Sequence, residues 1–158
     1  MTRTIARGDS VKWRNDGYIG HDVTSKLSGY FKSPGGPGGI GRKEEFQKTF
    51  KQAGTFGYLC RLHDAYDMKG TITVPIKVTV SGNMFTVTVA STSTSGTKWR
   101  NRIQYRKGSG DWKTLTTTTA KSVTYQPSSG STYSFRSEVR NSQTGATSAW
   151  SPVVTRTR

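Results

Sequence analysis

Short segments in which apolar and polar residues alternate run along the whole chain of 158 residues. Alternation with a period of two predicts β-strands that bury one face, whereas the periodicity of amphipathic helices is scarce. We expect the strands Thr4–Ile5 and Ser10–Asn15 to form a pair around a turn at Gly8-Asp9. The pattern predicts further extended segments in the first half at His21–Thr24, Phe46–Phe50, Thr55–Cys60 and Gly70–Val74.

Seven alternating segments follow Pro75, at a spacing of about ten residues that is typical of a β-sandwich. Turn signals such as Gly108-Ser109-Gly110-Asp111 separate them. Pro75 therefore marks a predicted boundary between a domain of residues 1–75 and a domain of residues 76–158. The predicted strands of the second domain are Val78–Val80, Met84–Val89, Arg102–Arg106, Trp112–Leu115, Ser122–Tyr125, Tyr133–Arg140 and Val153–Thr155.

The composition agrees with thin β-sandwiches, because only 31% of the residues are hydrophobic and 18 are glycines. The Gly- and Pro-rich segment 33–41 predicts a loop, and no Gly-Lys-Ser/Thr follows it as a phosphate-binding loop would require. No segment approaches the roughly 20 apolar residues that span a bilayer, so we expect no transmembrane segment. No charged segment followed by an apolar one begins the chain, so we also expect no signal peptide in it.

The net charge of +15 is large for this length and unevenly distributed. Residues 1–75 carry 12 Lys/Arg against 7 Asp/Glu, and residues 76–158 carry 12 against 2. Such a surface favours an acidic protein or an anionic polymer as partner, although charge that only confers solubility explains it equally well. Since no basic run and no nucleic-acid-binding motif is present, sequence-specific recognition of nucleic acid is not expected.

The candidate chemistry lies in one constellation, because the chain has one cysteine, Cys60, and two histidines, His21 and His63. Cys60, His63 and Met68 follow in a Cys-x₂-His-x₄-Met spacing that allows one loop to reach one metal ion. One thiolate, two imidazoles and one thioether form the ligand set of a blue-copper site, so we predict one type 1 copper ion bound by these four residues. Zinc is a possible substitute, since it accepts the same nitrogen and sulfur ligands.

Each of these residues also has an ordinary alternative role, because single Cys and Met residues commonly fill cores. Asp22 and Asn15 are weak candidates for a hydrogen bond that tunes the cysteine. No acid–base pair is apparent, and His63 near Cys60 is better explained as a second ligand than as a base. We therefore do not expect an enzyme.

Residues 8–74 resemble the plastocyanin-like branch of the cupredoxin family of small blue-copper proteins. The segment Gly8–Asn15 resembles the family's Gly-Asp-x-Val-x-Trp-x-Asn strand, and His21-Asp22-Val23 resembles its His-x-Val. The segment Phe50–Cys60 resembles Phe-x-x-x-Gly-x-Tyr-x-Tyr-x-Cys, and the ligand loop has the plastocyanin spacing. The resemblance implies a Greek-key β-sandwich whose N-terminal strand is shortened here, which would expose a sheet edge.

Residues 76–158 resemble a fibronectin type III domain through Ile103–Arg106 with Trp112, through Tyr133–Asn141 and through Ser148–Pro152. This resemblance implies a non-catalytic sandwich of about seven strands. The expected fold is therefore all-β: a cupredoxin Greek-key β-sandwich followed by a fibronectin type III-like, immunoglobulin-like β-sandwich.

Three functions fit these expectations. The first is one-electron transfer through copper, with His63 passing electrons while the basic surface binds an acidic redox partner protein. The second is a non-enzymatic adhesion or structural module at a cell surface, in a matrix or in a larger assembly, in which the second domain binds an anionic surface polymer and the first is a copper binder or scaffold. The third is copper storage or delivery. The family resemblance implies an extracytoplasmic location: secreted, periplasmic or on the cell surface.

Overall fold

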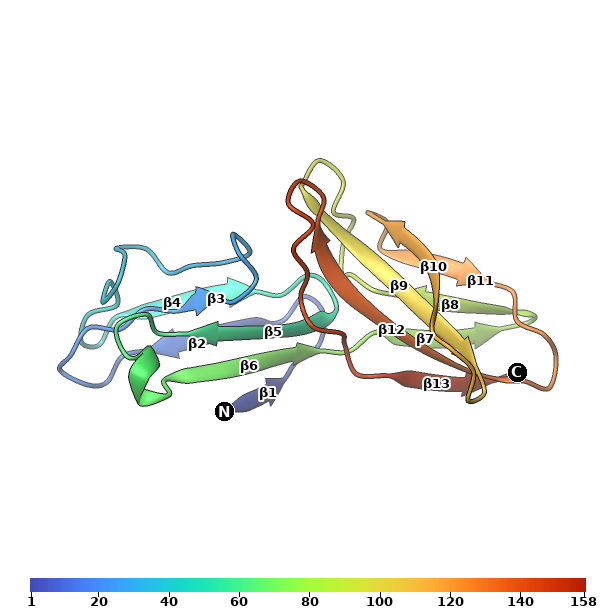
Figure 1. The fold of residues 1–158 in the computed structure, drawn as a ribbon, viewed down its shortest axis with the longest axis horizontal. Coiled ribbons are helices and arrows are strands. Elements are labelled where there is room, and N and C mark those ends of the chain that lie inside the picture. Colours follow the sequence, from blue (N-terminus) through green and yellow to red (C-terminus); the bar gives the residue numbers. More distant parts are fainter.

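The computed structural model describes all residues 1–158 and confirms the all-β prediction, because it contains strands, one short 3₁₀ turn and no α-helix. Two β-sandwiches lie end to end along the long axis of the molecule (Figure 1). No helix is long and apolar enough to cross a membrane. The strands of the first sandwich are β1 (Thr2–Thr4), β2 (Ser10–Arg14), β3 (Thr24–Ser25), β4 (Glu45–Thr49), β5 (Gly54–Leu59) and β6 (Lys69–Val74).

The first sandwich consists of a four-stranded sheet in the order β1-β6-β5-β3 and a two-stranded sheet of β2 and β4. In β5 and β6 the residues alternate between more and less buried positions, so that Phe56 and Ile72 face the interior. Trp13 of β2 covers the other side, where its ring stacks on Phe46 and meets the edge of Tyr58. An aromatic core therefore separates the two sheets behind the predicted ligand residues.

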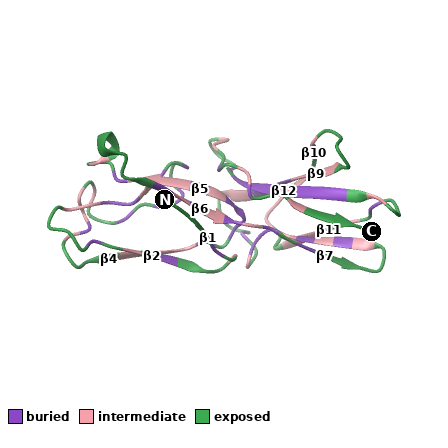
Figure 2. Ribbon diagram, turned by 90° about the horizontal axis from the view of Figure 1, so that it is seen from below, coloured by how far each residue is buried: buried purple, intermediate pink, exposed green.

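The second sandwich contains seven strands, as the pattern after Pro75 predicts. Four of them form the sheet β10-β9-β12-β13, and three form the sheet β11-β8-β7. Phe85, Ile103 and Phe135 are fully buried between the two sheets, and β12 is among the most buried strands of the molecule (Figure 2). The strands are β7 (Lys77–Ser81), β8 (Met84–Thr88), β9 (Trp99–Lys107), β10 (Lys113–Thr118), β11 (Ser122–Tyr125), β12 (Thr132–Asn141) and β13 (Val154–Thr157).

The two sandwiches are joined by more than the two-residue connection between β6 and β7. Val139 of β12 belongs to the first hydrophobic core, and Ala53 belongs to the second. The buried side chains of Gln52 and Asn101 are linked by a hydrogen bond of 3.0 Å. The backbones of Thr55 and Ala149 also exchange two hydrogen bonds. The two halves therefore share buried contacts across the predicted boundary at Pro75.

The predicted pairing of the first two strands is wrong. β1 pairs in parallel with β6, whereas β2 pairs with β4 in the other sheet. Gly8, at a φ of 97°, turns the chain from one sheet to the other, which needs a conformation that residues other than glycine rarely adopt. All three residues of β1 are exposed, and this short strand forms an edge of its sheet.

Candidate metal centre

The four predicted ligands come from the end of the first sandwich that lies farther from the second (Figure 1). His21 lies between β2 and β3 and forms two backbone hydrogen bonds with Ile40 of the Gly-rich loop. Cys60 directly follows β5, and Met68 directly precedes β6. His63 lies between them, immediately before the 3₁₀ turn η1 (Asp64–Tyr66).

Backbone hydrogen bonds close the loop that carries three of the ligands. The N–H of Cys60 donates to the carbonyl of Met68 at 2.9 Å, and the N–H groups of His63 and Met68 donate to the carbonyls of Cys60 and His63. Asp67 adopts a left-handed conformation with a φ of 59°, which ends the 3₁₀ turn and returns the chain to β6. The spacing of Cys-x₂-His-x₄-Met is therefore accommodated by one compact, internally bonded loop.

Three ligand atoms converge on one point. The Nδ1 atoms of His21 and His63 lie 3.1 Å apart, and the Sγ of Cys60 lies 3.4 Å from the Nδ1 of His63 and 3.9 Å from that of His21. The thiol of Cys60 is buried, and both imidazoles are partly exposed. The tertiary structure thus brings together residues that are 39 and 42 positions apart in the chain.

This arrangement fits a single metal ion. Metal–nitrogen bonds of about 2.0 Å and metal–sulfur bonds of about 2.3 Å separate the ligand atoms of a trigonal or tetrahedral site by roughly 3.3–3.7 Å. The three observed separations surround that range, so an ion fits between the atoms after small side-chain adjustments. A nitrogen and sulfur donor set is also the one that copper and zinc prefer over harder cations.

Met68 lies beside the same point. It lines a cavity of about 360 Å³ together with His21 and Cys60, and Trp13 and Tyr58 close the inner wall of this cavity. Met68 is 44% exposed, more than the three other predicted ligands. The structure therefore brings His21, Cys60 and His63 together, and Met68 lines the cavity beside two of them.

Asp22 contacts the thiol of Cys60 through both its backbone and its side chain. Its N–H donates to the Sγ of Cys60 at 3.4 Å, and its Oδ1 lies 3.4 Å from the same sulfur. The carboxylate is completely buried and accepts hydrogen bonds from Thr24 and from both the backbone and the guanidinium of Arg61. Although burial raises the pKa of Asp22, these hydrogen bonds outweigh burial and lower it overall. An ionised carboxylate therefore stands next to the predicted thiolate ligand.

Asn15, the other candidate for tuning the cysteine, has a different role. Its amide donates to the carbonyls of Ile19 and Ile40, and its Oδ1 accepts from the N–H of Gly17. These contacts tie the segment before His21 to the Gly-rich loop. The expectation of a hydrogen bond from Asn15 to Cys60 is therefore wrong, because the amide is already used to hold the loop that carries His21.

The electrostatics of His21 also suit a metal ligand. Burial and the neighbouring His63 lower the pKa of His21, and Asp22 only partly opposes them. Imidazole binds metals through a neutral nitrogen, so a lowered pKa makes His21 available to a metal over a wider range of pH.

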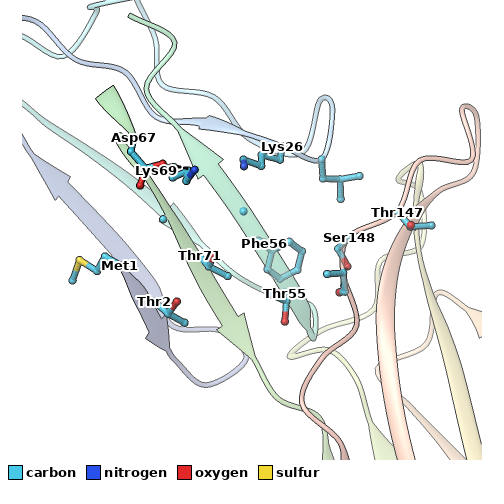
Figure 3. Close-up of a pocket in the computed structure, with 14 residues that line it drawn as sticks. Met1, Thr2, Lys26, Thr55, Phe56, Asp67, Lys69, Thr71, Thr147 and Ser148 are labelled. Atoms are coloured by element: carbon cyan, nitrogen blue, oxygen red, sulfur yellow. Dashed lines mark hydrogen bonds and ion pairs between the residues drawn. The ribbon is translucent and has the colours of Figure 1, made fainter. Parts of the chain in front are cut away.

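A larger cavity of about 510 Å³ lies where the two halves meet (Figure 3). Its lining comes mainly from β1, β5, β6 and the segment 147–149, and is completed by Lys26 and Leu27 after β3 and by Asp67 before β6. The charged groups among its lining residues are Lys26, Lys69 and Asp67, and Asp67 forms an ion pair with Lys69. No cysteine or histidine lines this cavity, so it is not a candidate metal site, and the metal centre at Cys60 is the candidate functional site.

The β-sandwich and its nitrogen and sulfur donors are typical of a copper-binding protein. Comparison with known sequences identifies the family. Residues 2–75 match the family described as copper binding proteins of the plastocyanin/azurin family. The plastocyanin of Scenedesmus fuscus is 33% identical to this chain, over 45% of this chain and 79% of that relative. The chain therefore belongs to the plastocyanin/azurin family, and its first half is a copper-binding cupredoxin domain.

Two solved structures are among the matches. A novel purple cupredoxin from Nitrosopumilus maritimus is 26% identical, with a TM-score of 0.41, over 46% of this chain and 76% of that one. A chain of a cytokine receptor complex is 14% identical, with a TM-score of 0.44, over 96% of this chain and 92% of that one.

Two structural features cannot be recognised from the sequence pattern alone. The bond from the Arg61 guanidinium to Asp22 has no signal in the pattern, because the two residues meet only when β5 and the segment after His21 come together. The second feature is a series of stacked arginine and tryptophan side chains on the second sandwich. The alternation of Arg100, Arg102 and Arg106 along one strand is the signal that could have indicated it.

Proposed function

We propose that this protein is a type 1 copper protein that transfers single electrons and catalyses no reaction of its own. The observation that carries the proposal is the convergence of the Cys60 Sγ with the Nδ1 atoms of His21 and His63, beside Met68. Copper, when bound, supplies a couple between Cu(II) and Cu(I). The roles of the protein are to hold the four ligands in nearly the same positions in both states and to exclude bulk water from the thiolate.

The surface around the site supports transfer to a protein partner. The ring of His63 is partly exposed and forms a short route from the metal position to the surface. Exposed apolar side chains neighbour it in the chain, with Leu62 50% and Tyr66 82% exposed. Apolar surface of this kind allows a partner to approach closely, and the net charge of +15 favours an acidic one. We propose an acidic redox protein as this partner.

The remaining parts of the proposal follow from the family and the fold. We propose that the second half is a fibronectin type III-like domain and that the protein acts outside the cytoplasm. The seven strands of the sheets β10-β9-β12-β13 and β11-β8-β7 support the domain assignment, and the plastocyanin relative supports the location.

The test is to add Cu(II) to metal-free protein, record the visible spectrum and then measure the reduction potential by voltammetry. We expect one copper per chain, an intense band near about 600 nm from the covalent thiolate–copper bond, and a reversible one-electron wave. Cys60→Ser should abolish the band, whereas Met84→Leu, at a remote strand, should leave it unchanged. Retention of zinc with no copper band, or an irreversible wave, would contradict electron transfer.

A further inference from the structure

One face of the second sandwich carries an unusual concentration of arginine. On β9 and β12, Ile103, Phe135 and Val139 point into the cores, so the alternate residues project from the outer face of the sheet. Five of these outward residues are arginines, and they extend over about 20 Å of strand. We name them the arginine strip: Arg100, Arg102 and Arg106 of β9 with Arg136 and Arg140 of β12.

Two tryptophans hold the centre of the arginine strip in place. The guanidiniums of Arg106 and Arg136 lie 4.8 and 4.1 Å from the ring centre of Trp112. Those of Arg136 and Arg102 lie 4.4 and 5.1 Å from the ring centre of Trp150. Arginine and tryptophan therefore alternate in one stack. Stacking restricts the guanidinium planes, so less side-chain entropy is lost when they bind an anion.

The positive charge of the strip is only partly balanced. Glu138 forms an ion pair with Arg102, and the only other acidic residue of the second half is Asp111. The Nε atoms of Arg102 and Arg106 have no hydrogen-bond partner, and Arg140 is exposed. Burial, followed by repulsion from Arg106 and Arg102, lowers the pKa of Arg136 in spite of Glu138. The strip is thus a crowded row of cations that an external anion would stabilise.

We propose that the arginine strip is a docking site for a linear polyanionic polysaccharide, one that carries sulfate or carboxylate groups at regular intervals. The planar guanidiniums match such groups because each can donate two parallel hydrogen bonds to one anion. A linear polymer suits a row of cations that follows the strands. This inference is independent of the copper site, which lies in the other half of the molecule (Figure 1).

The geometry of the stack disfavours nucleic acid. Proteins that bind single strands stack bases on exposed aromatic faces, whereas here Trp112 and Trp150 each have arginines against the ring. Readout of duplex DNA uses a helix or a two-stranded ribbon that enters the major groove, and the arginine strip lies on the face of a four-stranded sheet.

The test measures binding of fluorescently labelled dextran sulfate to the full chain at physiological salt, by fluorescence anisotropy. Arg106→Gln together with Arg140→Gln should weaken binding about tenfold, because two charge-assisted anion contacts are lost. The matched control is Lys77→Gln with Lys121→Gln, which removes two exposed charges outside the strip and should change affinity less than about twofold. Glu138→Gln removes the carboxylate of the strip and should tighten binding.

Several outcomes would overturn the proposal. Equal loss in the two double variants would show that net charge, rather than the strip, determines binding. Equal affinity for uncharged dextran would exclude anion recognition, and tighter binding of single- or double-stranded DNA at the same salt would assign the strip to nucleic acid. Thermal unfolding checks that each variant is folded. If the arginine double variant is not folded, Glu138→Gln decides, since weaker or unchanged binding by that variant contradicts the proposal.

Discussion

The carboxylate of Asp22 lies 3.4 Å from the Sγ of Cys60 and is closed off from solvent. Its other hydrogen bonds come from Thr24 and Arg61. Asp22, which follows His21, therefore contacts Cys60, and Arg61, which follows Cys60, binds Asp22. This reciprocal arrangement holds the two segments of the metal centre together before any metal is bound.

Asp22→Asn should destabilise the metal-free protein by about 2 kcal/mol, because the Arg61 guanidinium loses its buried anionic partner. The measurement is chemical denaturation followed by tryptophan fluorescence. Asp16→Asn is the control: Asp16 also pairs with cations, Arg14 and Lys43, but on the exposed surface, and its loss should leave the transition nearly unchanged. Equal effects of the two substitutions would show that Asp22 does not anchor the site.

Met68→Leu should preserve the copper band near about 600 nm but raise the reduction potential. With copper bound, the thioether would be a weak donor that stabilises Cu(II), and leucine of similar size would remove the donor while keeping the volume. Voltammetry of the copper-loaded protein measures the shift. An unchanged potential would show that Met68, which is 44% exposed, does not act on the metal.

Gln52→Ala should destabilise both halves together. Its amide donates to the Oδ1 of the fully buried Asn101, whose Nδ2 already has no partner. Removing Gln52 leaves the whole amide of Asn101 without a hydrogen bond, at a cost of about 2 kcal/mol. Calorimetry should show one transition at a lower temperature in the variant. Gln126→Ala, at an exposed position, should have no effect, and two separate transitions in the parent protein would contradict coupling of the halves.

Glu138→Gln should alter how stability depends on pH. Burial raises the pKa of Glu138 above its usual value of 4.5, although Arg102 opposes this. The folded state then binds the proton more tightly than the unfolded state, so the contribution of Glu138 to stability falls as pH rises from about 4.5 through the raised pKa. Thermal unfolding of both proteins from pH 4 to 8 should show that the variant becomes more stable relative to the parent as pH rises. If the variant instead became less stable relative to the parent over this range, the raised pKa of Glu138 would be contradicted.

Much of the fold can be predicted from local periodicity. Residues such as Val78 or Phe135 alternate with polar neighbours, and burial of one strand face follows from that alternation wherever the strand is placed. The membership of the ligand group is equally visible, because the single cysteine, the two histidines and the loop spacing leave few other choices.

Only the tertiary structure decides which strands become neighbours and what surrounds the ligands. Pairing depends on long-range packing that a period-two pattern does not encode, so β1 joins β6 rather than β2. The ionised Asp22 behind Cys60, the contact of Val139 with the first core and the stacking of Arg136 between two indoles all arise in the same way. Each needs side chains distant in the chain to meet in space, and their contacts set the environment of the metal centre and the shape of the charged surface.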